Sequence, residues 1–311
     1  MTIPGRLKDF LTSRPLPSTA FQLSTSWLTA ARATGRNPKS GRHAILPLRS
    51  GSLEPSFDRP NIKDLAHLAD RVHEALGRLD SRGRDISLLV SESCLKSVIL
   101  SFEELPDSPA EREEFVLWRL KKQMPSLSED IRLSFDVLNE GRPCRVFASV
   151  IRAAVLAEYE DLFARLGAKV RNVGLATLSL SGLLHLDTAS SGILANIEED
   201  SLSLLAVIDS QVVFYRSKPF LPDSREIRSF ARRMDHIARE ITNTVTFLED
   251  REKARVETLW IRAVPTEGDD DPLTALKPLV PLGLKPVEPA RWGGLKAREA
   301  RLLAPLMGQL P

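Results

Sequence analysis

The chain has 311 residues, 42% of them hydrophobic, so it is long enough to bury a core in one large domain or in two of ordinary size. Its 43 Lys and Arg residues are balanced by 41 Asp and Glu residues, and the signs alternate along most predicted helices, which argues against nucleic acid as a partner. Cys94 and Cys144 lie far apart without a metal-type or redox-type pair, so both are expected to be buried thiols. No apolar run is long enough to span a bilayer, and no signal peptide is recognisable, so we expect a soluble cytoplasmic protein.

The first fourteen residues contain a short amphipathic turn. Apolar residues gather on one side of it and basic residues surround them: Leu7, Phe10 and Leu11, with Arg6, Lys8 and Arg14. Such a segment can touch a membrane surface. A loosely docked or frayed terminus is the favoured interpretation, because the segment is short and chain ends are commonly disordered.

The sequence of residues 20–79 predicts a small meander of β-strands followed by a helix. Short strands are expected at residues 20–23, 27–33 and 43–48, with a solvated loop at residues 34–41. Asn61 is expected to cap a helix whose apolar residues recur at spacings of three and four as far as Leu79.

Residues 86–151 predict a compact α/β insert of two strands, one helix and two strands. The helix is expected to begin with a capping box at Ser108 and Glu111, with proline at its first position, and to stop at Pro125. The four strands are predicted at residues 86–90, 95–100, 133–138 and 146–151. The first half is expected to end with three elements. They are a helix that stops at Gly167, a strand at residues 170–173, and a second helix that stops near His185.

The second half predicts apolar strands from Gly192 to Arg216, with an acidic turn at residues 198–200 and another turn at Asp209 and Ser210. The longest helix is expected to open at Asp223 and Glu226 and to run through about seven turns. The chain is then expected to form a strand at residues 258–264, an acidic loop at 267–271 and a short helix at 273–279. A strand at residues 284–287 and a closing helix at 297–307 follow.

A strand-turn-strand opening in each half, with an inserted subdomain, resembles the actin-like ATPase fold. Short sequence motifs, spread over nearly the whole chain, resemble those of the PilM family of type IV pilus assembly proteins. In that family a short N-terminal leader with aromatic and basic residues precedes a strand that reads Asp-Ile-Gly-Ser-Ser. Here residues 7–10 form the leader, and the corresponding strand reads Gln22-Leu23-Ser24-Thr25-Ser26. Two further motifs resemble the family. One is Leu105-Pro106 before a helix that contains Glu114 and Trp118 and closes at Met124-Pro125. The other is a motif of Tyr, Gly and Val within residues 159–173.

The resemblance implies an α/β protein with an actin-like, ribonuclease-H-like fold of two lobes and a small inserted α/β subdomain. The first lobe is expected at residues 1–190, including the insert at residues 86–151, and the second lobe at residues 191–311.

All three nucleotide-binding elements of the family depart from its pattern here. The first phosphate loop has Gln22 and Ser24 in place of Asp and Gly, and the second has Asn196 and Glu198 in the corresponding places. Where the family has a Gly-rich adenosine loop, this chain has residues 262–265, Arg-Ala-Val-Pro, whose side chains would crowd a purine.

Each departure weakens nucleotide binding. Amide side chains lack the negative charge that hard cations such as Mg²⁺ favour, and a Cβ at Ser24 or Glu198 restricts the backbone where it would curl against phosphate. We therefore expect no nucleotide cofactor, no metal and no ATP turnover. Glu199 or Asp200 could instead recruit Mg²⁺, but their order along the strand does not match the family pattern.

The acidic turn at residues 198–200 is open to two interpretations, a relic of the pocket or a solvated hairpin turn, and the second is favoured. The five histidines show no ligand spacing; His67 and His73 are expected on the polar side of a helix. Ser91-Glu92-Ser93 lacks the glycine frame of a nucleophile elbow, so hydrolase chemistry has no support.

The helix at residues 109–124 is apolar over more than one face, because Phe115, Val116, Leu117, Trp118 and Leu120 are nearly consecutive. In the PilM family this subdomain and the first lobe together hold the N-terminal cytoplasmic peptide of the membrane protein PilN. The resemblance therefore implies a peptide groove here, with Phe115, Trp118, Lys121 and Lys122 as candidate partner-binding residues. Burial of the apolar residues in the core, and dipole compensation by the lysine pair, are the simpler alternatives.

These observations predict a non-catalytic cytoplasmic adaptor of a type IV pilus inner-membrane platform, peripheral to the membrane through a PilN-like partner. One alternative is an active actin-like ATPase with a rearranged metal site. Another is the cytoplasmic scaffold of a type II secretion system, which normally continues into a transmembrane helix that this sequence does not show.

Overall fold

The structure is a computed structural model that describes residues 16–33, 41–81, 85–139, 141–184, 190–220, 229–265, 271–287 and 294–310. The predictions for the leader at residues 1–14, for His185 and for Asp223 and Glu226 lie outside the described residues, as does most of the acidic loop at residues 267–271.

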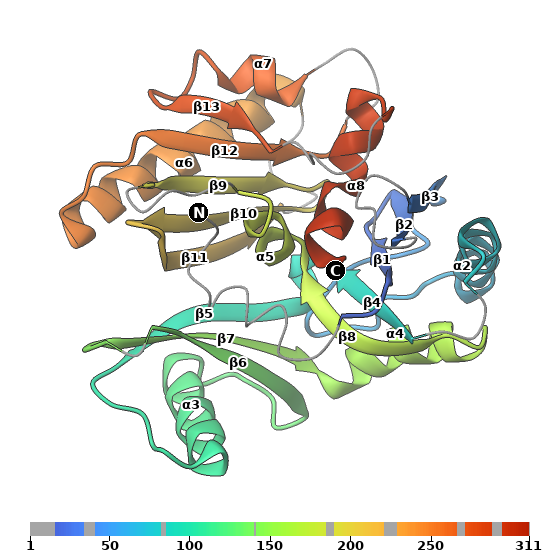
Figure 1. Cartoon of the computed structure of the whole chain (residues 1–311), viewed down its shortest axis with the longest axis horizontal. Helices are drawn as coiled ribbons and strands as arrows, with labels where there is room; N and C mark the ends of the chain where they lie inside the picture. The colour runs from blue at the N-terminus through green and yellow to red at the C-terminus, as the bar shows by residue number, and fades with distance from the viewer. Residues whose placement is uncertain are drawn as a thin grey trace.

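The first lobe is built on a five-stranded sheet in the order β3-β2-β1-β4-β8 (Figure 1). β1 pairs antiparallel with β2 and β2 with β3, whereas β4 and β8 run parallel to β1. The strands span β1 (Thr19–Leu23), β2 (Trp27–Ala33), β3 (Gly41–Pro47), β4 (Asp85–Val90) and β8 (Lys169–Leu175). Every residue of β1 is buried, as expected for a central strand with both faces covered.

The second lobe repeats this topology in the order β11-β10-β9-β12-β13. Its first three strands form an antiparallel meander, and the last two run parallel to the first of them. The strands span β9 (Gly192–Ile197), β10 (Ser201–Ile208), β11 (Gln211–Pro219), β12 (Thr258–Ala263) and β13 (Gly283–Pro286). Two sheets with one shared, ribonuclease-H-like strand order make the two-lobed actin-like fold, so the predicted fold class is confirmed.

Helices cover both faces of each sheet. α2 (Leu65–Leu79) and α4 (Ala153–Ala164) pack on the face of the first sheet that carries Phe21 and Leu23, and α6 (Phe230–Glu252) and α7 (Pro272–Leu276) pack on the second sheet. The opposite faces are covered by α8 (Ala297–Gln309) on the first sheet and α5 (Ala176–Ser181) on the second. α5 and α8 pack against each other between the lobes (Figure 1). The chain therefore returns to the first lobe at its last described helix, and the predicted lobe boundary at residue 190 remains a prediction.

The insert is a separate three-stranded sheet in the order β5-β7-β6 with α3 (Pro109–Gln123) on one face. Its strands are β5 (Leu95–Phe102), β6 (Ile131–Asn139) and β7 (Cys144–Arg152). Residues 86–90, predicted as part of this insert, instead form the strand of the first sheet between β1 and β8. These residues are apolar apart from Ser87, a pattern that suits a buried strand of either sheet, so the local sequence could not assign them to one sheet or the other.

Two predicted helix caps differ in the structure. Asp64, and not Asn61, caps α2 by accepting from the backbone N–H of His67, and Asn61 is buried. Ser108 does stand at the N-cap of α3, but its hydroxyl makes no capping bond, so the capping box does not form. In the part of the chain that is described, no helix combines the length and hydrophobicity needed to cross a membrane.

Candidate functional site between the two lobes

The turns that follow β1 and β9, where the two phosphate loops were sought, face each other across the junction of the lobes. The Gln22 side-chain amide donates from Nε2 to Oε1 of Glu198 over 3.0 Å, and the Thr25 hydroxyl donates to Oε2 of Glu199 over 3.2 Å. Each bond joins one lobe to the other. The sequence predicted both segments, but not their direct contact.

Arg262 of β12 lies at the centre of this contact, although only 2% of it is exposed. Its Nη1 donates to Oδ1 of Asn196 over 3.0 Å and forms an ion pair with Oε1 of Glu198, and its Nε donates to the Arg301 carbonyl oxygen over 2.9 Å. A buried guanidinium is tolerated only when charged and polar partners of this kind surround it. The Arg262 side chain, expected to crowd a purine, instead contacts Asn196 of the neighbouring strand β9 and Glu198 of the second phosphate loop.

The acidic turn lies against the first lobe and is not a fully solvated hairpin turn, so the favoured interpretation was wrong: Glu198 is buried, and Glu199 and Asp200 are half-buried. Glu198 is 3% exposed, and Asp200 accepts a hydrogen bond of 2.6 Å from the Ser91 hydroxyl of the first lobe. The turn directs its carboxylates into the lobe junction, where the β1–β2 turn and the residues after β4 cover them. A turn is usually solvated because loops lie at surfaces, but this one lies against a second lobe.

Glu92, in the short 3-10 turn after β4, is a second buried carboxylate that joins the lobes. Its Oε1 accepts from the Thr177 N–H over 2.8 Å and from the Thr177 hydroxyl over 2.5 Å. Its Oε2 accepts from the hydroxyls of Ser203 on β10 and Tyr215 on β11, the latter over 3.2 Å. Sequence reasoning did not select Glu92 for this role; the available signal was an acidic residue directly after a buried apolar strand.

Burial governs the acid–base chemistry of this cluster. Desolvation raises the pKa of Glu199 to about 7, helped by the neighbouring charges of Glu198 and Asp200. Desolvation also raises the pKa values of Glu92 and Asp200, against hydrogen bonds that lower them. The pKa of Arg233, which donates to the Glu198 carbonyl oxygen from α6, is lowered by burial. Glu199 is therefore poised to hold a proton near neutral pH.

The space among these side chains is closed. The gap bounded by Gln22, Ser24, Ser91, Glu198 and Asp200 has no volume that a water-sized sphere could occupy. Among the described residues, no group of three or more His, Cys, Asp or Glu side chains is arranged to hold a metal ion. The arrangement is suited to holding the lobes together through direct side-chain contacts.

A cleft of about 930 Å³ opens next to this cluster. Its walls come from the loop after β3, from β5 of the insert, and from the end of β11, so all three parts of the molecule contribute. The lining mixes hydroxyls, charges and apolar groups, including Thr25, Phe57, Lys96, Met124, Asp200 and Phe220. Lys96 lies over the Phe57 ring at 4.4 Å. A cleft with apolar walls and separate polar groups can bind an extended peptide.

The four candidate partner-binding residues lie on α3, outside the lining of this cleft. Trp118 is 47% exposed, its ring stacks on Phe115 with centroids 5.7 Å apart, and the Lys122 ammonium lies 4.1 Å from its centroid. Lys121 is also exposed. Val116 and Leu120 are the residues of α3 that enter the core. The structure therefore brings Phe115, Trp118 and Lys122 together on the helix surface, and their predicted role stays a prediction.

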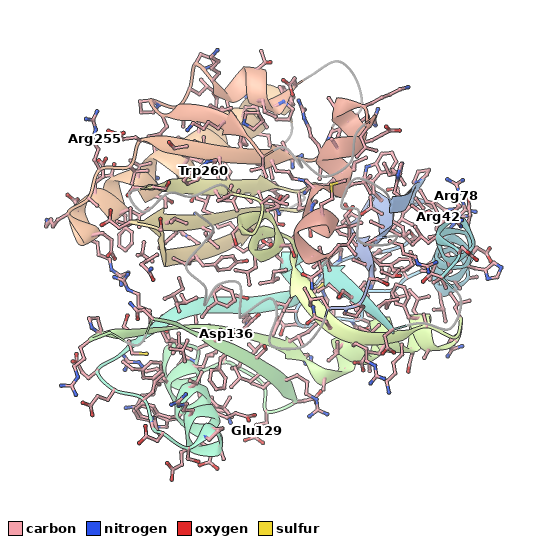
Figure 2. All side chains as sticks on the ribbon, viewed as in Figure 1. Arg42, Arg78, Glu129, Asp136, Arg255 and Trp260 are labelled. Atoms are coloured by element: carbon pink, nitrogen blue, oxygen red, sulfur yellow. The ribbon has the colours of Figure 1, made fainter. Side chains whose placement is uncertain are left out.

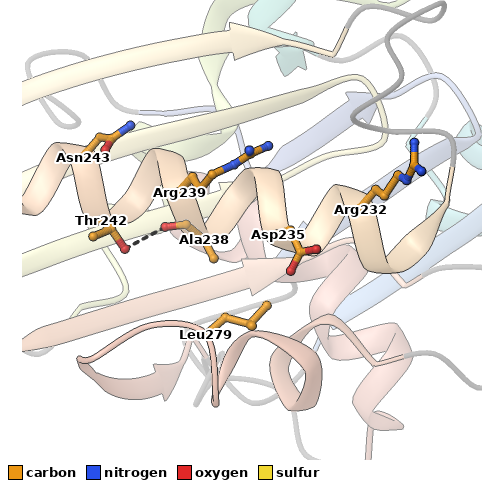
Figure 3. Close-up of a pocket in the computed structure, with 7 residues that line it drawn as sticks. All are labelled: Arg232, Asp235, Ala238, Arg239, Thr242, Asn243 and Leu279. Atoms are coloured by element: carbon orange, nitrogen blue, oxygen red, sulfur yellow. Dashed lines mark hydrogen bonds between the residues drawn. The ribbon is translucent and has the colours of Figure 1, made fainter.

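A further cavity of about 690 Å³ runs along α6 (Figure 3). Polar side chains of α6, including Arg232, Asp235 and Arg239, form one wall, and Leu279, which is 40% exposed, lies opposite. This surface belongs to the second lobe and is separate from the lobe junction.

Both cysteines are buried thiols, as predicted. Of the histidines, His73 is exposed, and His67 is half-buried and accepts a hydrogen bond from the Arg49 N–H over 3.0 Å.

No protein-family model matches the chain, and no curated protein matches its sequence. Among solved structures, a chain of the PilM-PilN type IV pilus biogenesis complex superposes with a TM-score of 0.74 at 16% identity, covering 96% of this chain and 97% of that chain. A protein of unknown function with an actin-like ATPase fold from Bacteroides thetaiotaomicron gives a TM-score of 0.47 at 11% identity, covering 88% and 92%. The first similarity confirms the predicted resemblance to PilM at the level of the fold.

Proposed function

We propose that this protein is a PilM-like adaptor of a type IV pilus assembly platform at the inner membrane. In this proposal it resides in the cytoplasm, binds the N-terminal cytoplasmic peptide of a PilN-like membrane protein, and does not hydrolyse ATP. One observation supports the proposal above all. The lobe junction is closed by contacts among Gln22, Glu198 and Arg262, and an open cleft lies beside it.

The closed junction supports an adaptor over an ATPase. A nucleotide needs space between the phosphate loops and donors that face its phosphates, whereas here the facing groups are carboxylates. Two like unit charges 4 Å apart repel by roughly 4 kcal/mol at the effective dielectric of a protein surface. An anionic ligand would have to displace the Arg262–Glu198 pair and overcome this repulsion.

The cleft supports peptide binding, because it lies between the first lobe and the insert. Met124 and Leu95 of the insert and Leu53 of the loop after β3 supply apolar surface, and the hydroxyls of Ser26 and Ser97 lie nearby. An extended peptide gains affinity from main-chain hydrogen bonds and specificity from side-chain pockets, and the polar and apolar groups of this lining suit such a ligand.

Isothermal titration calorimetry with the full chain and a synthetic peptide tests this location. The peptide comprises the N-terminal cytoplasmic residues of a PilN-like protein from the same organism. Met124→Ala and Lys96→Ala should each weaken binding about tenfold, which corresponds to about 1.4 kcal/mol, because they remove contact surface from the cleft. Leu279→Ala, in the cavity along α6, is the matched control and should leave binding unchanged.

Trp118→Ala decides whether the surface of α3 takes part. Weaker peptide binding assigns α3 to the interface, and unchanged binding restricts the peptide to the cleft. If neither the cleft variants nor Trp118→Ala alter the affinity, the proposed peptide site is wrong.

A thermal shift assay with Mg²⁺ and ATP tests the catalytic alternative. A ligand at 100 times its dissociation constant stabilises the folded state by about 2.7 kcal/mol, which would raise the melting temperature by several degrees. We expect no shift. A clear shift that disappears in Glu199→Gln would favour the ATPase with a rearranged metal site.

A further inference from the structure

The buried lobe junction carries more negative than positive charge. Among the described residues its ionisable groups are four carboxylates and two guanidiniums: Glu92, Glu198, Glu199, Asp200, Arg233 and Arg262. Charge removed from water must be neutralised by an opposite charge, by a bound cation or by a proton. The two arginines can balance two of the four carboxylates, and Asp200, which is half-buried, borders the open cleft, so one carboxylate requires one of the other solutions.

Three buried oxygens in this cluster have no hydrogen-bond partner. They are Oε1 of Gln22, Oε2 of Glu198 and Oε1 of Glu199. Gln22 is only 5% exposed, and its amide lies directly against Glu198, so its free oxygen faces the same enclosed space. An unpaired buried acceptor is costly, and a proton on a neighbouring carboxyl would supply the missing donor.

A cation is the weaker solution for this site. The acidic side chains of the described residues are not arranged as a metal-binding group, and the space among them does not admit a water-sized sphere. A proton needs no such space.

We propose that the two lobes close with a proton bound in this carboxylate cluster, on Glu199, and that their contact weakens as the pH rises. The groups that face Glu199 are its neighbours Glu198 and Asp200, the hydroxyls of Ser24 and Thr25 of the first lobe, Arg233 of α6 and Arg262 of β12. Loss of the proton places a second buried negative charge beside Glu198. The lobe junction would thereby be a proton-sensitive contact in the place that a nucleotide occupies in the ATPases of this fold.

Stability should fall with rising pH because the pKa of Glu199 is raised in the folded protein. The pKa of Glu199 rises from 4.5 to about 7 because burial disfavours the charged form. Its contribution to folding is therefore fully present below the unfolded-state value and is lost as the pH rises through about 7. Asp136 of the insert also has a pKa raised to about 7, so the two residues must be separated in any test.

The test compares Asp136→Asn with Asp136→Asn/Glu199→Gln between pH 5 and pH 8.5. The single variant should lose thermal stability as the pH rises, and the double variant should lose less and melt several degrees higher at the upper end. Amide hydrogen exchange provides the local readout: after correction for the intrinsic rate, segments 22–27 and 196–203 should exchange faster at high pH only when Glu199 is present. Equal slopes for the two variants, or exchange in these segments independent of pH, would overturn the proposal.

Two further measurements need no folded variant of Glu199. The infrared band of protonated carboxyl groups should weaken in Asp136→Asn between pH 6 and pH 8.5, as Glu199 loses its proton; a band that is absent at pH 6, or unchanged over this range, would contradict the bound proton. Added K⁺ or Mg²⁺ at pH 8 should not restore stability beyond the effect of ionic strength seen with choline chloride. A specific restoration by either metal ion would identify a cation site instead.

Discussion

Gln22 and Glu198 are 176 positions apart in the sequence, and a hydrogen bond of 3.0 Å joins their side chains across the two lobes. In the family that the sequence resembles, the corresponding positions belong to the two phosphate loops. Here an amide and a carboxylate meet directly, and Arg262 completes the contact through its ion pair with the same carboxylate oxygen. The lobes are thus joined by direct side-chain contacts at the point where the fold usually surrounds a ligand.

The Arg262–Glu198 pair should behave as a coupled buried pair. Arg262→Met and Glu198→Gln should each destabilise the protein by about 3–5 kcal/mol, because each leaves the other charge buried without its partner. The double variant should be less destabilised than the sum of the two by at least about 1 kcal/mol. Urea unfolding of the four proteins measures this coupling, and additive effects would show that the pair does not interact.

Gly308 of α8 should not tolerate a side chain. A Cβ at this position would lie 1.8 Å from the Ser179 carbonyl oxygen of α5, so Gly308→Ala must move the two helices apart and should cost about 3 kcal/mol or more. Gly77→Ala in α2 is the control: its Cβ would meet nothing within 4 Å, and it should stabilise by about 0.5–1 kcal/mol. Thermal and urea unfolding give both values. A neutral Gly308→Ala would contradict the close packing of α5 and α8.

Asp136 should make stability depend on pH from within the insert (Figure 2). Desolvation on β6 raises its pKa to about 7, so its contribution to stability is present at low pH and is lost as the pH rises through that value. Asp136→Asn should therefore be more stable than the wild type at pH 8.5 and similar to it near pH 4. Melting curves at these two pH values decide the matter, and a variant less stable at both would contradict the assignment.

Asn61 should be important for the first lobe. Its Oδ1 accepts from the Ser56 N–H over 2.8 Å, and its Nδ2 donates to the Tyr159 hydroxyl over 3.3 Å and to Sγ of Cys94 over 3.2 Å. Asn61→Ala removes all three bonds and leaves the Ser56 N–H without this acceptor, so it should destabilise by about 1–3 kcal/mol. Asp64→Ala, which removes the actual cap of α2, should cost about 1 kcal/mol. If Asn61→Ala proves milder than Asp64→Ala, the buried hydrogen bonds contribute little.

The elements of this protein could be predicted from local sequence. Apolar residues at helical spacing identified α2 and α6, because one face of each helix packs on the core, and short apolar runs between turn residues identified nearly all strands. Two strand meanders followed by helices were enough to indicate a two-lobed fold. The residues at the phosphate-loop positions could be named, and their departure from the family pattern could be seen.

What the sequence could not decide was where each element pairs and what each charge meets. Residues 86–90 are apolar on both sides, a pattern equally suited to the insert or to the centre of the first sheet, and only the pairing with β1 assigns them. Glu198, Glu199 and Asp200 have the composition of a solvated turn, and only the approach of the first lobe buries them. Local propensity depends on neighbours in the chain, whereas burial and charge pairing depend on neighbours in space, which for Gln22 and Glu198 the fold alone supplies.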